Sequence, residues 1–208
     1  MLVALPAARH AHAPLKIAIV SGLSDPASCA LSDLQHAFLD RLDAPRDAIV
    51  DRNFPFVDAV APRRVPPLWL ASLRNAQQFL GASRPSYAAH ARRHWRALRD
   101  SADALVVITL SCGLEILRHC VEPEDARRAI HVLALGPVAR ALPALPCTLV
   151  QGTRDPISHL FFRNAIRIPN LGHLDYFRSN TVLTIANQIL CSNTLRSSAA
   201  DSIFRSAV

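Results

Sequence analysis

The sequence predicts an α/β protein in which a doubly wound, mostly parallel sheet of about six strands carries helices on both faces. Short apolar runs rich in β-branched residues, such as 16–20 and 104–108, are typical of buried strands. Between these runs lie longer segments whose apolar residues recur at helical spacing. Strand and helix therefore alternate, as in a parallel sheet, whose strands need crossover connections. Half of the 208 residues are hydrophobic, which is enough to bury a core.

The expected elements follow one another without an internal repeat. Strands are expected at 16–20, 48–51, 104–108, 130–135, 147–150 and 165–168, and helices at 30–42, 68–80, 86–100, 112–120 and 179–191. Ser32 is the expected N-cap of the first helix, and Gly81 is expected to end the second. We therefore expect one α/β domain over residues 16–192, with an N-terminal tail at 1–15 and a C-terminal tail or short helix at 193–208.

The distribution of basic residues argues against a nucleic-acid partner. The formal net charge is +7, yet the basic residues are spread along the chain, and the densest group lies on one expected helix: Arg92, Arg93, Arg96 and Arg99. This distribution favours solvated helix faces over a nucleic-acid surface, which would need one continuous basic face. No apolar run has the length needed to span a bilayer. We expect no nucleic-acid partner and no membrane span, and we leave a homodimer open.

The cysteines do not suggest a disulfide framework or a zinc site. There are five of them, their spacing is irregular, and no Cys/His cluster has zinc-ligand spacing: Cys29, Cys112, Cys120, Cys147 and Cys191. Reduced, mostly buried thiols fit a cytoplasmic protein. We expect neither a metal nor an organic cofactor.

Ser111 lies directly between an expected strand and an expected helix, within Thr109-Leu110-Ser111-Cys112-Gly113. A serine in that place, with a glycine two residues later, is typical of a nucleophile elbow. Thr109 stands where this motif usually has its first glycine. The alternative role for Ser111 is the N-cap of the following helix. Cys112 is a second candidate nucleophile, but Leu114 would then occupy the position that needs a small residue.

Two further polar residues follow later strands. Asp155 comes three residues after Gly152, and His173 comes directly after Gly172. A carboxylate and an imidazole in these loops have the chemistry of an acid and a general base that act on a serine. The alternatives are that Asp155 only caps a turn or short helix and that His173 makes only a structural hydrogen bond. Asp175, two residues after His173, is a second candidate acid.

The three residues occur in the order Ser, Asp, His, and each follows an expected strand. This is the order found in α/β hydrolases, and it differs from that of other triad folds. Because the carboxyl ends of parallel strands share one edge of the sheet, we expect Ser111, Asp155 and His173 to meet there. The backbone N–H groups of Cys112 and of Leu23, after the first strand, are the expected oxyanion donors.

These segments resemble the α/β-hydrolase superfamily, in particular the small lidless proteins related to dienelactone hydrolases and the KANSL3/TEX-like group. The resemblance covers roughly residues 16–192 and rests on the Arg52-Asn53-Phe54-Pro55-Phe56 segment, on Gly152 with Asp155, and on Gly172 with His173. It implies a minimal α/β-hydrolase fold without a large cap.

We expect a serine hydrolase that acts through an acyl-enzyme on an ester or thioester of a small or acyl-chain carboxylic acid. The expected partner is a small-molecule or acyl-carrier-type substrate. Candidates to border its pocket are Ser24, Phe56 and Trp69, together with Arg63 and Arg64. The alternative is a catalytically degenerate binding or scaffolding protein on the same fold, which the threonine at 109 favours.

Overall fold

The computed structural model describes residues 2–57 and 64–205, with side chains described as far as Asn193. Its centre is a six-stranded sheet with the order β2-β1-β3-β4-β5-β6 and only parallel neighbours. The strands are β1 (Ala13–Ser21), β2 (Ile49–Asn53), β3 (Ala102–Leu110), β4 (Ala129–Leu135), β5 (Cys147–Arg154) and β6 (Ile166–Gly172). The predicted α/β class with a doubly wound parallel sheet is confirmed.

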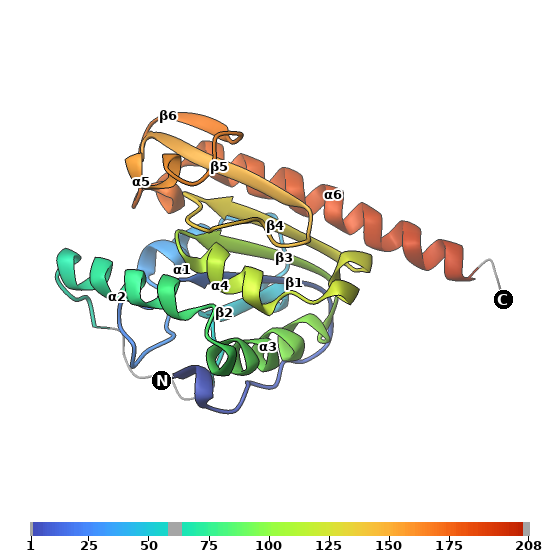
Figure 1. Cartoon of the computed structure of the whole chain (residues 1–208). Coiled ribbons are helices and arrows are strands. Elements are labelled where there is room, and N and C mark those ends of the chain that lie inside the picture. The colour runs from blue at the N-terminus through green and yellow to red at the C-terminus, as the bar shows by residue number, and fades with distance from the viewer. Residues whose placement is uncertain (1, 58–63, 206–208) are drawn as a thin grey trace.

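Helices cover both faces of this sheet. They are α1 (Asp33–Leu39), α2 (Leu68–Gly81), α3 (Pro85–Arg99), α4 (Gly113–Cys120), α5 (Pro156–His159) and α6 (Asn180–Arg205). In Figure 1, α2, α3 and α4 lie on the side of the sheet that faces the viewer, and α1 and α6 lie behind it. Ser32 caps α1 as predicted, since its hydroxyl accepts a hydrogen bond from the Gln35 N–H.

The core is divided by the sheet because successive strand residues point to opposite faces. Leu105 and Val107 of β3 belong to the core that α3 and α4 complete, whereas Val106 and Ile108 belong to the core that α1 and α6 complete. Both faces of each central strand are therefore apolar, which explains the near-continuous hydrophobic runs in the sequence.

Both ends of the chain carry more structure than the predicted tails. β1 begins at Ala13, and the side chains of Val3 and Ala8 are buried. The Val3 carbonyl also lies 3.0 Å from the ring Nε2 of His94 in α3. At the other end α6 continues from Asn180 to Arg205 without the predicted break near 192. The N-terminal segment is ordered because its apolar side chains are removed from water against α3.

The strand order places a topological switch point between β1 and β3. The chain moves from β1 outward to β2, and then returns to the other side of β1 to form β3. In open α/β sheets, ligands bind at such a point, outside the carboxyl ends of the strands. Among the described residues, no helix combines the length and the apolar character needed to cross a membrane.

Candidate active site

Ser111, Asp155 and His173 meet at the carboxyl edge of the sheet, directly after β3, β5 and β6. The His173 Nε2 lies 3.0 Å from the Ser111 Oγ, and the His173 Nδ1 lies 2.9 Å from the Asp155 Oδ2. An ionised carboxylate only accepts hydrogen bonds, so we assign the imidazole proton to Nδ1. The unprotonated Nε2 then accepts from the serine hydroxyl. This is the hydrogen-bond chain that a nucleophile, a base and an orienting acid require.

The backbone around Ser111 forms a tight elbow. Ser111 has a φ of 55°, in the left-handed region that non-glycine residues rarely adopt. A Cβ on Gly113 would lie 1.9 Å from the Val20 carbonyl oxygen, so only glycine allows this close approach to β1. The N-cap of α4 is Cys112, without a side-chain capping bond. Ser111 therefore does not cap the helix, and its hydroxyl is directed to His173 instead.

Thr109 is accommodated beneath this elbow. Its side chain is fully buried in β3, and its Oγ1 has no hydrogen-bond partner among the described residues. The elbow keeps its geometry nonetheless, since the Ser111 Oγ remains 3.0 Å from His173. The threonine thus leaves a buried hydroxyl unsatisfied without separating Ser111 from the histidine.

The Asp155 carboxylate is fully buried and accepts hydrogen bonds from three donors. Besides His173, the Tyr176 hydroxyl donates to Oδ2 at 2.6 Å and the Ser158 N–H donates to Oδ1 at 3.2 Å. Burial by itself would raise the pKa of Asp155, but the bonds from His173, Tyr176 and Ser158 hold that pKa well below its ordinary value. Asp155 is therefore ionised at neutral pH and can hold the imidazole in one tautomer.

Tyr176 is a site residue that the sequence did not reveal. Its hydroxyl donates to Asp155 and accepts from the Gly152 N–H at 2.9 Å, so it ties the acid to the end of β5. Gly136 makes room for this pair, because a Cβ there would lie 2.7 Å from both the Asp155 Oδ2 and the Tyr176 ring. An aromatic hydroxyl three residues after the histidine was the available signal.

Asp175, the second candidate acid, serves the turn instead. Its Oδ2 accepts from the Gly172 N–H at 3.2 Å, and its Oδ1 pairs with Arg178 at 3.6 Å. It stabilises the loop that presents His173, while the carboxylate that faces the imidazole belongs to Asp155.

Cys112, the second candidate nucleophile, has an unreactive side chain. The thiol is buried, and this burial raises its pKa to about 12. A thiol in that state is neutral at pH 7 and is a poor nucleophile. Its backbone N–H lies at the start of α4, where N–H groups lack intrahelical acceptors. That N–H remains the candidate oxyanion donor beside Ser111.

The Leu23 N–H, the other predicted oxyanion donor, is engaged by α2. It donates to the side-chain Oε1 of Gln78 at 2.9 Å, and the Gln78 Nε2 donates back to the Leu23 carbonyl at 2.7 Å. The sequence gives no sign of this pair, whose members lie 55 positions apart.

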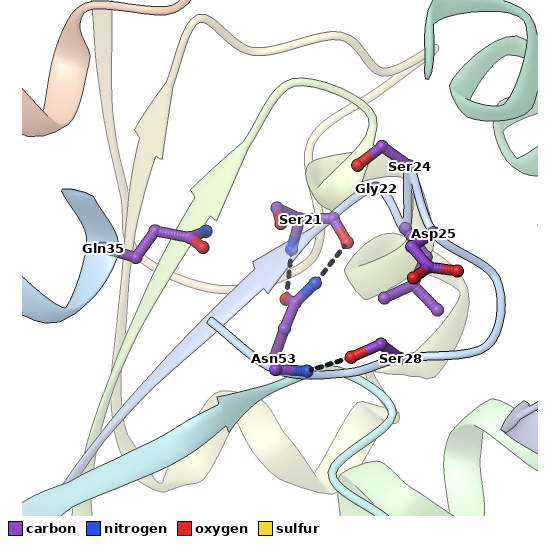
Figure 2. A pocket seen from close by; sticks show the side chains of 9 residues that line it. Ser21, Gly22, Ser24, Asp25, Ser28, Gln35 and Asn53 are labelled. Carbon is purple, nitrogen blue, oxygen red and sulfur yellow. Dashed lines mark hydrogen bonds between the residues drawn. The ribbon is translucent and has the colours of Figure 1, made fainter. Parts of the chain in front are cut away.

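The loop after β1 surrounds a small cavity of about 20 Å³. Figure 2 shows how Asn53, at the end of β2, binds both the N–H and the carbonyl of Ser21 at 2.9 and 3.2 Å. The pocket candidate Ser24 lines this cavity, and its carbonyl accepts from Arg74 of α2. The cavity has room for about one water molecule, so it is no substrate pocket.

The remaining pocket candidates have different surroundings. Phe56 is fully buried against Phe54, so it belongs to the core and does not border an open pocket. Trp69 is exposed on α2. The backbone N–H of Arg64 donates to Asp25, and Arg63 lies outside the described residues.

The arginine-rich helix is partly neutralised. On α3, Arg96 binds Glu122 at 2.7 Å, and Arg99 binds the buried Asp125 at 2.6 Å. Arg92 donates to the His119 carbonyl. Two of the arginines in this densest group thus have carboxylate partners, which interrupts the basic face that nucleic-acid binding would require.

Comparisons with known proteins find similarity to solved structures. No family model matches the chain. No curated protein matches it either. The crystal structure of esterase PE8 is similar to it with a TM-score of 0.45 and 15% sequence identity, over 90% of this chain and 96% of that chain.

Proposed function

We propose that this protein is a serine hydrolase that cleaves an ester or thioester of a carboxylic acid through an acyl-enzyme. The observation that carries the proposal is the position of His173, whose two ring nitrogens lie 3.0 Å from the Ser111 Oγ and 2.9 Å from the Asp155 Oδ2. The strained elbow at Ser111 and the ionised, buried Asp155 support the same reading.

The proposed reaction has two halves. In the first, His173 Nε2 takes the Ser111 proton while the Ser111 Oγ attacks the carbonyl carbon, and the imidazolium then gives that proton to the leaving alcohol or thiol. In the second, His173 takes a proton from water, whose oxygen attacks the acyl-enzyme, and the carboxylic acid leaves as the Ser111 hydroxyl is restored. Asp155 stabilises the imidazolium in both halves, and the Cys112 and Leu23 N–H groups are the donors to the oxyanion.

We propose further that the acyl group comes from a small or acyl-chain carboxylic acid and that the protein acts in the cytoplasm. The free state of the described cysteines fits a reducing compartment. Neither step requires a metal or an organic cofactor, because the proton transfers and the attack use side chains already in contact.

The test is hydrolysis of p-nitrophenyl esters and acyl thioesters of increasing chain length by the wild type and by Ser111→Ala. We expect Ser111→Ala to lower kcat/KM by at least about a thousandfold. The matched control is Ser192→Ala, because Ser192 is exposed on α6; it should leave turnover unchanged. Full activity in Ser111→Ala would reject the assignment.

A further inference from the structure

Gln78 of α2 accepts a hydrogen bond from the Leu23 N–H, which the proposed reaction needs as an oxyanion donor. Its carboxamide oxygen accepts the Leu23 N–H at 2.9 Å, and its amide donates to the Leu23 carbonyl at 2.7 Å. We propose that Gln78 blocks the oxyanion hole in this closed form and that α2 acts as a gate that must move before the proposed hydrolysis can occur. This inference rests on the proposed function.

One N–H cannot serve both acceptors well. The single Leu23 hydrogen points at the Gln78 oxygen, so a substrate oxyanion would have to displace that oxygen. While Gln78 stays in place, the hole retains only the Cys112 donor of the predicted pair. Loss of one donor from such a hole typically costs about a hundred- to a thousandfold in rate. The closed form is therefore a poor catalyst, and the reaction would proceed from the form in which Gln78 has left.

Helix α2 is attached in a way that permits this movement. No residue of α2 is fully buried, and its first turn has no side-chain cap. Its other contacts include a hydrogen bond from Arg74 to the Ser24 carbonyl at 2.8 Å. The Phe79 ring lies 4.6 Å from the Arg140 guanidinium and meets the Phe161 ring edge to face at 5.7 Å. Such contacts at a surface can break without exposing a core.

The closed position also carries a cost that opening removes. Asn75, one turn before Gln78, packs over Gly22, so that a Cβ on Gly22 would lie 2.5 Å from the Asn75 Oδ1. This oxygen is buried and has no hydrogen-bond partner among the described residues. A buried polar atom without a partner is unfavourable. Lifting α2 would return the Asn75 oxygen to water and offset part of the loss of the Gln78 bonds.

The rival role for Gln78 is that of a positioning residue, which would hold Leu23 in the right orientation for catalysis. The two roles predict opposite signs for the same variant. Gln78→Ala should speed the reaction if the carboxamide blocks the hole, and slow it if the carboxamide only orients Leu23. The neighbour Gln77 provides a matched control, since it is the same residue type on the same helix and is exposed.

The experiment measures the rate at which a fluorophosphonate labels Ser111 in the wild type, Gln78→Ala and Gln77→Ala. We expect Gln78→Ala to label about three- to tenfold faster than the wild type, because two hydrogen bonds that favour the closed form are lost. Gln77→Ala should match the wild type. A rate in Gln78→Ala that equals or falls below that of the wild type would overturn the gate.

Hydrogen exchange of the Leu23 amide, followed by NMR, reports on the contact without any activity. The gate predicts faster exchange of this amide in Gln78→Ala than in Gln77→Ala, and equal exchange in the two would overturn it. If exchange is faster but Ser111 is labelled in no variant, the proposed function fails, and the gate fails with it. If the wild type is labelled and Gln78→Ala is slower, only the gate fails.

Discussion

Helices α2 and α3 are neighbours in sequence and similar in length, but they are attached to the sheet in different ways. Each carries one of the two tryptophans of the chain. Trp95 of α3 is 1% exposed, whereas Trp69 of α2 is 69% exposed. Figure 1 shows α3 along the lower part of the sheet and α2 extending beyond its edge. A helical pattern of apolar residues in a sequence therefore does not by itself tell whether the helix belongs to the framework, meaning the sheet and the helices whose side chains fill its core.

The polar contacts of the two helices explain the contrast. In α3, the Trp95 indole N–H and the Arg99 guanidinium both bind the buried Asp125, at 2.7 and 2.6 Å. The carboxylates around Arg99 raise the pKa of this already basic group despite its burial. The Gln78 and Arg74 side chains of α2 bind backbone groups of the β1 loop instead. Thus α3 is fixed through the core, while α2 is fixed at the site itself.

Replacement of the two tryptophans tests this contrast with the largest expected effect. Trp95→Ala should lower the free energy of unfolding by about 3–5 kcal/mol, because it empties a core site and leaves Asp125 without one of its donors. Trp69→Ala should change it by less than about 0.5 kcal/mol. Urea denaturation measures both. Equal losses would mean that α2 is part of the framework after all.

Two glycines provide a second pair, one in the elbow and one at the end of α2. Gly113→Ala should lower the unfolding free energy by more than about 3 kcal/mol and abolish Ser111 labelling, because its Cβ would meet the Val20 carbonyl at 1.9 Å. A Cβ on Gly81 would meet nothing within 4 Å, so Gly81→Ala should stabilise the protein by up to about 1 kcal/mol. Thermal unfolding of both variants measures these changes. A Gly113→Ala variant as stable as the wild type would contradict the elbow geometry.

Acid should weaken the bond between Glu115 and Arg140, whose guanidinium lies over the Phe79 ring of α2. Glu115 of α4 is buried, which would raise its pKa, but bonds from Arg118 and Arg140 lower that pKa to about 2. A lowered pKa means that the stabilisation is complete above the ordinary pKa of 4.5 and is lost as the pH falls toward 2. We expect the wild type to lose about 1–3 kcal/mol more than Glu115→Gln between pH 5 and pH 2. Parallel curves of unfolding free energy against pH would refute this.

Removing the hydrogen bond from Tyr176 to Asp155 should have a smaller effect on the candidate active site. Tyr176→Phe removes the donor to Asp155 and the acceptor of the Gly152 N–H, and should lower kcat by about tenfold with little change in KM. The matched control is Tyr87→Phe, which removes the hydroxyl of the other tyrosine, on α3. An unchanged kcat in Tyr176→Phe would show that Asp155 is held well enough by its other partners.

The sequence predicted the fold because its signals were local. The strand runs alternate with helical patterns, and the elements found in the structure lie close to the expected ranges. The same logic located the three polar residues of the site, since parallel strands deliver their carboxyl ends to one edge. The extent of ordered structure at the two termini could not be predicted from the sequence, because it depends on tertiary contacts such as that of Val3 with α3.

The features that the sequence missed depend on contacts between distant segments. Gln78 lies on a helix whose sequence gives no sign that it would reach Leu23. Phe56 has a φ of 59°, and the backbone there places its ring in the core rather than at the site. Thr109 departs from the usual elbow pattern, yet the cost is confined to one buried hydroxyl. A motif therefore predicted which side chains meet at the edge of the sheet better than it predicted which segments cover them.

The most direct test that Ser111 is the nucleophile is mass mapping after incubation with a fluorophosphonate. The proteins compared are the wild type, Gln78→Ala, and the same two backgrounds carrying Ser111→Ala. An activated Ser111 should give a single adduct on the peptide that contains it, and no adduct once that serine is replaced. An adduct on another residue, or none in folded protein of either serine-containing background, would contradict the assignment of Ser111 as an activated nucleophile.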